Sequence, residues 1–279
     1  MTQIHWFPGH MKKALNEISE RIKIVDVVIE ILDARAPLSS MNPDLEKTIK
    51  NKKRLAVLSK ADLADPEQTK LWSKELKKEF DEFLILNLND PKSAKTLSLA
   101  VSKLGEEKHK KDISKGMKPQ PIKAMIIGIP NVGKSSLINR LANRKATGVQ
   151  NKPGYTRGEQ FIKVNSDFVL LDTPGVLPMN YDDKNRAINI ALLGSIREDI
   201  LPNDVLVKSL LYILRGYYPF SLKERYDISE INDDQEVLQN IAVRRGLKNG
   251  NSLDIEKAEI ILLKDFKDGK LGRITLDRK

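Results

Sequence analysis

The stretch from Gly128 to Ser135, GIPNVGKS, constrains the fold of this chain more than any other. It fits the pattern GxxxxGK[ST], with an apolar run at 124–127 before it and an amphipathic segment after it, as a strand–loop–helix phosphate loop requires. The glycines let backbone N–H groups converge on a phosphate at a helix N-terminus. Lys134 would reach the terminal phosphates and Ser135 would ligate Mg²⁺. The expected phosphate-binding residues of the loop are Asn131, Val132, Gly133, Lys134, Ser135 and Ser136.

The composition is that of a globular protein. With 279 residues, 40% of them apolar, the chain can bury one large core or two modest ones, and we expect two domains. It has no cysteine, which excludes disulfides and thiolate metal sites. The first residues lack the apolar core of a signal peptide, and no apolar run approaches the roughly 18 residues of a membrane helix. We expect a cytoplasmic monomer with no membrane partner.

The charge is strongly positive but unevenly distributed. The net charge of +10 suggests a polyanionic partner, yet residues 200–279 hold 14 basic and 13 acidic side chains and are nearly neutral. A nucleic-acid contact would have to come from local clusters, such as Lys50 to Arg54 or the lysines between Lys108 and Lys118. For each cluster taken alone, a solvated charged face is an equally good interpretation.

Apolar strands alternate with helical segments before the phosphate loop. We expect strands at 25–32, 55–58 and 83–88, with helices at 42–50, 67–80 and 97–104. This alternation predicts an α/β fold with a mostly parallel sheet and helices on both faces.

The regions on either side of the phosphate loop differ in character. Residues 106–121 are charged and lack periodicity, so we expect a linker there; 160–164 and 168–171 resemble a hairpin. From about 182 onward helical patterns dominate, and strand alternation returns only in the last few residues. The predicted domains are an α/β domain at 1–180, with an N-terminal arm at 1–22, and a small α-helical domain at 181–279.

Two further turns identify the nucleotide. Asp172-Thr173-Pro174-Gly175 supplies a DxxG turn, in which Asp172 serves the metal and Gly175 the terminal phosphate. Of the two KxD triplets, only Lys60-Ala61-Asp62 follows a strand, whereas Lys110-Lys111-Asp112 lies in the charged segment. Asp62 can accept both the N1 and N2 protons of guanine, and Lys60 can lie along the base. These features favour GTP and GDP as ligands.

The order of these turns is unusual. The base-reading turn precedes the phosphate loop, although in Ras-like GTPases it follows. Both turns must lie at the carboxyl edge of one sheet to meet one nucleotide, so the order implies a circular permutation.

With this order, WFPGHM at 6–11 and DARAPLSSMNP at 33–43, the chain resembles the YlqF/RbgA family of circularly permuted GTPases. These are bacterial factors in late assembly of the large ribosomal subunit. The resemblance covers essentially the whole chain. It implies that Thr156 in PGYT is the switch I ligand of Mg²⁺, alongside Ser135 and Asp172. It also implies an RNA-binding helical domain, precursors of the large subunit and their rRNA as partners, and ribosome-stimulated GTP hydrolysis.

The chain departs from the family pattern in three places. The base motif reads SKAD, so that Ser59 offers a hydroxyl where an amide usually braces the base and the phosphate loop; we expect this to alter affinity more than specificity. The second base-contact turn has no clean match, and Asn87 is its weak candidate. After DTPG the sequence reads Val176-Leu177-Pro178-Met179, which differs from the usual switch.

The catalytic residues that the resemblance implies are His10, Lys134 and Thr156. Val176 occupies the position of the glutamine that orients water in Ras-like enzymes and cannot replace it. His10 is the family's substitute, although a histidine beside Trp6 and Phe7 is equally well explained by packing or RNA contact. Asn131 matches an asparagine that ligates K⁺ in some relatives, and an ordinary loop role is the alternative.

Two functions of different class fit these features. The first is a hydrolytic switch that binds pre-ribosomes with GTP and leaves after hydrolysis. The second is a nucleotide-gated RNA-binding scaffold with vestigial hydrolysis, which Ser59, Val176 and the altered switch would permit.

Overall fold

The structure is a computed structural model that describes residues 9–88, 90–142, 161–179, 181, 183–196, 200–229 and 233–279. Its strands are β1 (Val27–Asp33), β2 (Lys53–Ser59), β3 (Glu82–Ile85), β4 (Ile122–Ile127), β5 (Phe161–Lys163), β6 (Phe168–Leu171), β7 (Lys248–Asn249) and β8 (Ser252–Leu253). Its helices are α1 (Gly9–Arg21), η1 (Ile22–Ile24), α2 (Pro43–Ile49), α3 (Pro66–Leu76), η2 (Lys77–Glu79), α4 (Ser93–Leu104), α5 (Glu106–Ser114), α6 (Lys134–Ala142), α7 (Lys184–Leu192), α8 (Asn203–Tyr217), α9 (Ser221–Tyr226), α10 (Asp234–Arg245) and α11 (Ile255–Lys267).

Six strands form one sheet in the order β3-β2-β1-β4-β6-β5. Every neighbouring pair is parallel except the β5–β6 hairpin, which is antiparallel. All seven residues of β1 are buried, as expected for a central strand of a parallel sheet that is covered on both faces. The predicted α/β fold is confirmed, and the predicted strands and hairpin are present with shifts of a few residues at their ends.

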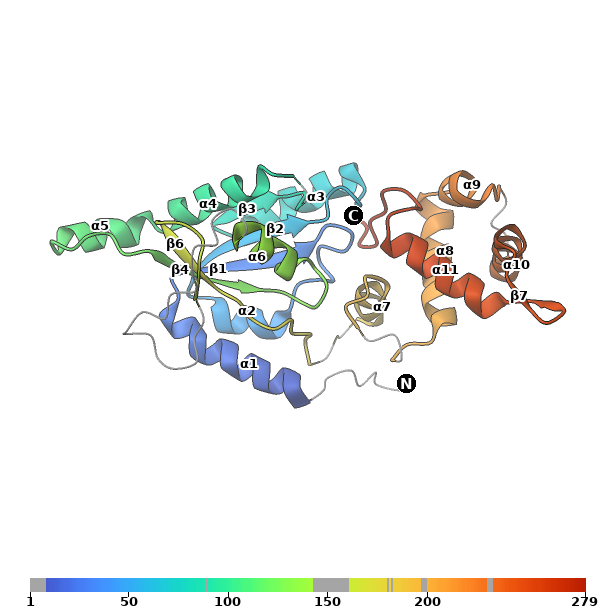
Figure 1. Cartoon of the computed structure of the whole chain (residues 1–279), viewed down its shortest axis with the longest axis horizontal. Helices are drawn as coiled ribbons and strands as arrows, with labels where there is room; N and C mark the ends of the chain where they lie inside the picture. The colour runs from blue at the N-terminus through green and yellow to red at the C-terminus, as the bar shows by residue number, and fades with distance from the viewer. Residues whose placement is uncertain are drawn as a thin grey trace.

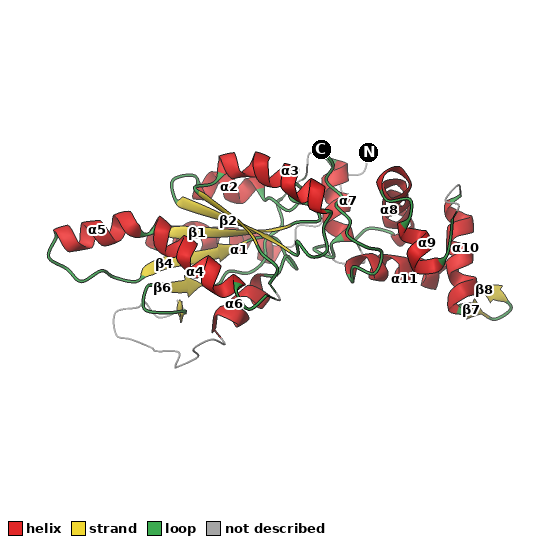
Figure 2. Cartoon of the chain, turned by 90° about the horizontal axis from the view of Figure 1, so that it is seen from above, coloured by secondary structure: helices red, strands yellow, loops and turns green. Residues whose placement is uncertain are grey.

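Helices cover both faces of the sheet (Figure 2). On one face, α1 and α2 pack on Val28 and Met125, and α3 packs on Leu32 and Leu58. On the opposite face, α4 and α6 pack on the alternate residues of the strands, among them Ile29. The alternation of side chains along each strand thus divides the core into two layers.

The remaining helices form a separate group beyond one end of the sheet (Figure 1). Helices α8, α10 and α11 pack together there, with the short α9 and the β7–β8 hairpin at their periphery. The predicted helical character of this region is confirmed. The strand alternation expected in the last few residues is wrong, because the only strands among the described residues after 171 are those of the hairpin at 248–253. Residues 268–279 instead form turns and irregular chain.

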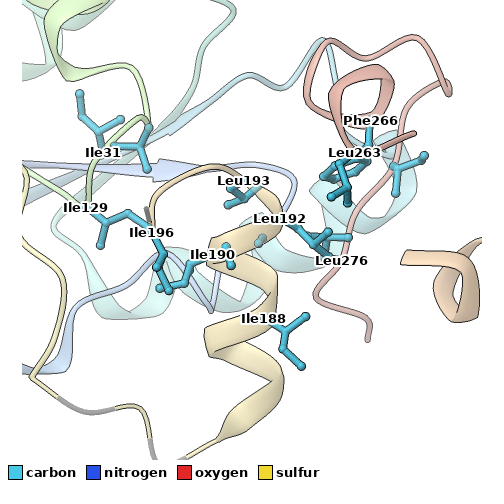
Figure 3. Close-up of a cluster of buried hydrophobic side chains, with 14 of the residues drawn as sticks. Ile31, Ile129, Ile188, Ile190, Leu192, Leu193, Ile196, Leu263, Phe266 and Leu276 are labelled. Carbon is cyan, nitrogen blue, oxygen red and sulfur yellow. The ribbon is translucent and has the colours of Figure 1, made fainter. Parts of the chain in front are cut away.

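Helix α7 connects the two parts of the molecule. One buried cluster runs from Ile31 and Ile129 at the sheet, through Ile190 of α7 and Leu193 just after it, to Phe266 of α11 (Figure 3). Because the apolar core is continuous, the helical group is packed against the sheet rather than joined only by a linker.

The charged segment before β4 is not the irregular linker that the sequence suggested. Residues 106–114 form α5, which projects from the edge of the molecule farthest from the helical group (Figure 1). The helix is polar nearly all round and is held by charge pairs, such as Lys108 Nζ with Asp26 Oδ2 at 2.7 Å, rather than by an apolar stripe. Such a helix carries no hydrophobic periodicity for sequence analysis to detect. No helix among the described residues has the length and apolarity needed to cross a membrane.

Candidate nucleotide site

The predicted motifs come together at the carboxyl edge of the sheet. The phosphate loop follows β4, the DxxG turn follows β6, and the base-reading turn follows β2. Because β2, β1, β4 and β6 are neighbours and parallel, the turns that follow them share one edge. The structure therefore forms one site from motifs that stand in permuted order along the chain.

The phosphate loop needs its second glycine for two reasons. Gly133 has a φ of 104°, which side chains rarely adopt, and a Cβ at this position would lie 2.8 Å from Leu88 Cδ1. Leu88 follows β3, so the turn after that strand packs on the loop. Val132 is fully buried beside Gly133, whereas Ser135 and Ser136 are exposed at the start of α6.

Lys134 is folded back over the loop that carries it. Its Nζ donates to the carbonyl oxygens of Gly128, at 3.1 Å, and Ile129, at 2.9 Å. Burial lowers the pKa of the Lys134 ammonium to about 8, although the nearby Asp172 carboxylate opposes the shift. A buried cation whose hydrogen bonds within the described part of the chain go to carbonyl oxygens is suited to an anion such as a terminal phosphate.

The DxxG turn lies directly against the phosphate loop. A Cβ at Gly175 would lie 2.9 Å from both Lys134 Nζ and the Pro130 backbone, so only glycine fits there. Asp172 is exposed at the end of β6. Val176 is fully buried among side chains of α1 and α2, and its N–H donates to the Gly128 carbonyl at 3.3 Å. Its packing role excludes Val176 from contact with a catalytic water.

Ser59 of the base motif braces the phosphate loop. The side chain is fully buried, and its hydroxyl lies 2.6 Å from the Val132 carbonyl oxygen and 2.9 Å from that of Leu32. The brace that the sequence analysis associated with an amide is thus present, made by a smaller group.

Lys60 joins the base turn to two other elements. Its backbone is left-handed, with a φ of 54°. Its Nζ donates to the Asn131 carbonyl oxygen at 2.6 Å and pairs with Asp33 Oδ2 at 3.0 Å. The aliphatic stem of Lys60 thus spans from the base turn to the phosphate loop. Asp62, two residues on, is exposed.

Asp33 and Arg35 form a buried ion pair for which no site role was predicted. The fully buried Asp33 carboxylate accepts from Arg35 Nε at 3.0 Å and Nη2 at 2.9 Å. Burial alone would raise the pKa of the Asp33 carboxyl, but the charges of Arg35 and Lys60 outweigh it and lower the pKa to about 2. Arg35 also donates to the Lys267 carbonyl at the end of α11 and lies over the Phe266 ring. Their only sequence signal was the stretch beginning at Asp33, DARAPLSSMNP.

The phosphate loop also contacts the turn after α7. The Asn131 side-chain amide donates to the Gly194 carbonyl, and Ser195 Oγ donates to the Pro130 carbonyl at 2.7 Å. Asn131 has a φ of 62°, a left-handed conformation that is uncommon outside glycine. Two adjacent loop residues, Pro130 and Asn131, thus contact the turn after α7. Sequence reasoning missed Gly194 and Ser195.

The predicted site also included Asn87, His10 and Thr156. Asn87 is exposed after β3, and its carbonyl accepts from Ser93 Oγ at 2.6 Å. His10 lies in the first turn of α1, but its side chain is outside the described part of the chain. Thr156 also lies outside the described residues. Within the described residues there is no group of three or more His, Cys, Asp or Glu residues that could hold a metal without the nucleotide.

Comparison with known proteins gives consistent matches. A family model described as a 50S ribosome-binding GTPase matches residues 123–239. The chain is 41% identical over 277 residues to ribosome biogenesis GTPase A of Bacillus cereus, covering 98% of this chain and 93% of that protein. It is 40% identical over 278 residues to the Priestia megaterium protein of that name, covering 98% and 96%. The crystal structure of GNP-bound YlqF from Thermotoga maritima matches with a TM-score of 0.67 and 25% identity, covering 95% of this chain and 98% of that one.

Proposed function

This chain belongs to the ribosome biogenesis GTPase A family, and from that premise we propose that it binds precursors of the large ribosomal subunit in its GTP form and leaves after hydrolysis. It is a GTPase, converting GTP and water to GDP and phosphate. The observation that carries the proposal is that the phosphate loop, DxxG and base turns share one sheet edge, and that the loop also bonds to the turn after α7, the helix that connects the sheet with the helical group. The proposal includes rRNA as a partner and a monomeric protein that works in the cytoplasm.

The residues at the loop fit a magnesium ion. Mg²⁺ prefers oxygen ligands, and Ser135 at the start of α6 and Asp172 after β6 offer a hydroxyl and a carboxylate. Thr156 would complete the set from the PGYT segment. When bound, the ion neutralises charge on the phosphates. Lys134 contributes a buried positive charge beside the same phosphates, and Asn131 would hold a K⁺ ion near them.

The attacking water requires a group other than Val176, which is buried. We assign this role to His10, because a histidine can orient water or accept its proton. Its neighbour Met11 belongs to the same buried cluster as Leu177, which follows the DxxG turn. The first turn of α1 is therefore anchored in the same core as the segment that follows the DxxG turn.

The contacts between the phosphate loop and the turn after α7 suggest how the nucleotide state reaches the helical group, the proposed RNA-binding part. Occupation of the loop would bear on the Asn131–Gly194 and Pro130–Ser195 hydrogen bonds and hence on the position of α7. A ribosomal ligand that prefers one arrangement would shift its population and, by the same coupling, the hydrolysis rate.

Single-turnover GTP hydrolysis, measured with and without large ribosomal subunits or their precursors, tests this function. We expect slow intrinsic hydrolysis, strong stimulation by subunits, and tighter subunit binding with a non-hydrolysable GTP analogue than with GDP. His10→Ala should lose most of the stimulation while still binding subunits in the GTP form. His109→Ala is the matched control, since His109 lies on α5 and contacts the Gln120 carbonyl.

The alternative scaffold function predicts that large ribosomal subunits do not raise the rate of GTP hydrolysis. If subunits bind the GTP form preferentially but do not stimulate hydrolysis, the protein is a nucleotide-gated scaffold with vestigial turnover. If subunits bind the GTP and GDP forms equally, the proposed hydrolytic switch is rejected. Unchanged stimulation in His10→Ala would remove the catalytic role of His10 alone.

A further inference from the structure

The turn that carries Asp62 is covered by a segment from the far end of the chain. Arg273 donates from Nε to the Ala64 carbonyl at 2.8 Å and from Nη2 to the Ala61 carbonyl at 2.9 Å. The Ile274 N–H donates to the Leu63 carbonyl at 3.1 Å. Three carbonyls of the base turn thus have their partners in two consecutive residues that follow α11.

A fourth hydrogen bond extends this contact to the next helix. Thr275 Oγ1 accepts from the Asp65 N–H at 3.1 Å, at the N-cap of α3. Ile274 and Thr275 are almost fully buried at this contact. Buried backbone groups need partners, and this turn obtains them from about 210 residues away rather than from its own strand and helix.

The covering segment is itself firmly held. The Asp277 carboxylate accepts from the Ser39 N–H at 2.7 Å and from Asn189 Nδ2 of α7 at 3.0 Å. The Asp277 carbonyl accepts from Trp72 Nε1 of α3 at 2.9 Å. The Leu276 N–H donates to the Arg35 carbonyl at 2.6 Å. Figure 1 shows the C-terminus beside α3, on the sheet side of the molecule.

The conformation of the base turn makes such support necessary. Lys60 adopts a left-handed backbone without being glycine, which costs energy and persists only where the surroundings impose it. Asp62 must present its carboxylate edge-on to a base. In a loosely held turn the carboxylate would sample many orientations, and fewer of them would pair with guanine. The Ala61 carbonyl that Arg273 holds lies in the residue between Lys60 and Asp62.

We propose that residues 273–276 are part of the guanine-binding site, with Arg273 as a positioning residue that fixes the turn carrying Asp62. The inference rests on Asp62 as the base-reading residue. It gives the helical group a second connection to the nucleotide, since α11 leads into this segment through residues 268–272. The connection acts on the base, which GTP and GDP share, and so changes both affinities by the same factor.

Comparing guanosine with inosine diphosphate tests this positioning role. Inosine lacks the 2-amino group, so the ratio of GDP to IDP affinity reports how well Asp62 is aimed at that group. In Arg273→Ala we expect the affinities for GDP and for a non-hydrolysable GTP analogue to fall equally, by roughly three- to tenfold. The IDP affinity should fall less, so the GDP to IDP ratio narrows.

Two further variants make the test decisive. Arg244→Ala is the matched control, because Arg244 also donates to a backbone carbonyl, that of Asp227 in the helical group, and should keep the parental ratio. Arg273→Lys keeps the charge and one donor and should restore part of the ratio; it also replaces the alanine variant if that variant does not fold.

The outcomes separate this inference from the function on which it rests. A parental GDP to IDP ratio in both Arg273 variants would overturn the positioning role while leaving Asp62 and the GTPase function intact. A parent protein that binds GDP and IDP equally would overturn the base assignment and this inference together.

Discussion

The Lys60 ammonium lies 3.0 Å from the buried Asp33 carboxylate, and this pair joins the base turn to the end of the central strand. Arg35 extends the pair to α11 through the Lys267 carbonyl. One carboxylate therefore holds two cations, Lys60 in the base turn and Arg35, which contacts α11. Removal of the carboxylate would leave the buried Arg35 guanidinium without its counterion and would deprive Lys60 of its acidic partner.

Asp33→Asn should lower the free energy of unfolding by about 3–5 kcal/mol, the usual cost of leaving buried charges without their counterion. Urea denaturation with and without GDP measures this loss. Asp204→Asn is the control, since Asp204 forms an exposed pair with Lys208 at 3.4 Å that is worth less than about 1 kcal/mol. Equal effects of the two substitutions would contradict the role given to Asp33.

The contribution of Asp33 should depend on pH in a defined direction. Its pKa is lowered to about 2 in the folded protein from an ordinary value of 3.8, so the carboxylate stabilises the fold fully above about pH 4. This stabilisation is lost as the pH falls towards 2. The difference in unfolding free energy between parent and Asp33→Asn should therefore shrink between pH 4 and pH 2. A difference that stays constant over this range would show that the ionised Asp33 carboxylate does not stabilise the folded protein.

Ser59→Ala should weaken GTP and GDP binding together. The substitution leaves the buried Val132 carbonyl without its hydroxyl partner and frees the phosphate loop from β2, at a cost of about 1–3 kcal/mol. Isothermal titration with both nucleotides measures the loss. Ser73→Ala provides the comparison, because the Ser73 hydroxyl only contacts the Lys70 carbonyl on the exposed face of α3. Unchanged affinity in Ser59→Ala would mean that the loop needs no brace from the base motif.

The unmodified protein should bind GTP and GDP far better than ATP, because adenine cannot offer Asp62 the two donors of guanine. Asp62→Asn should relax this preference and reduce guanine affinity by on the order of a hundredfold. Asp112→Asn in α5 tests the other KxD triplet and should leave the preference unchanged. Equal binding of ATP and GTP by the parent would reject the base assignment.

Replacing Na⁺ by K⁺ should raise the hydrolysis rate if Asn131 holds a monovalent cation near the phosphates. We expect at least about a tenfold rise, a small share of the roughly 10³–10⁵ that an arginine finger supplies. Asn131→Ala should remove the dependence, and Asn185→Ala on the exposed start of α7 should retain it. If the hydrolysis rate of the parent protein does not depend on K⁺, the cation-binding role of Asn131 is rejected and its hydrogen bond to Gly194 remains.

Local patterns were enough to predict the sheet edge of the site. The phosphate loop, the DxxG turn and Lys60 each follow an apolar strand, and parallel strands necessarily bring their carboxyl ends together. The fold class followed from the same alternation. Binding of phosphate and guanine requires particular residue types in these turns, so the turns can be recognised in the sequence.

Contacts that side chains make to backbone carbonyls left no such signal. Arg273 binds the carbonyls of Ala61 and Ala64, and any residue type presents a carbonyl, so neither partner is marked in the sequence. Asn131 likewise meets the carbonyl of Gly194. Asp33 and Arg35 stood within a recognised motif, but their role depends on contacts with Lys60 and α11. Periodicity relates only residues that are close in the chain, so it could not predict these contacts. Helix α5 was missed because polar charge pairs, not an apolar stripe, hold it.

The docking of residues 273–276 on the turn after β2 also sets an order for folding. This contact closes a loop of about 200 residues, and contacts of such sequence separation form after local ones. The parallel sheet and the phosphate loop can assemble while the base turn is still unsupported. Refolding protein should therefore recover its sheet before its affinity for guanine nucleotides, and partial unfolding of the α11 region should release nucleotide while the sheet remains intact.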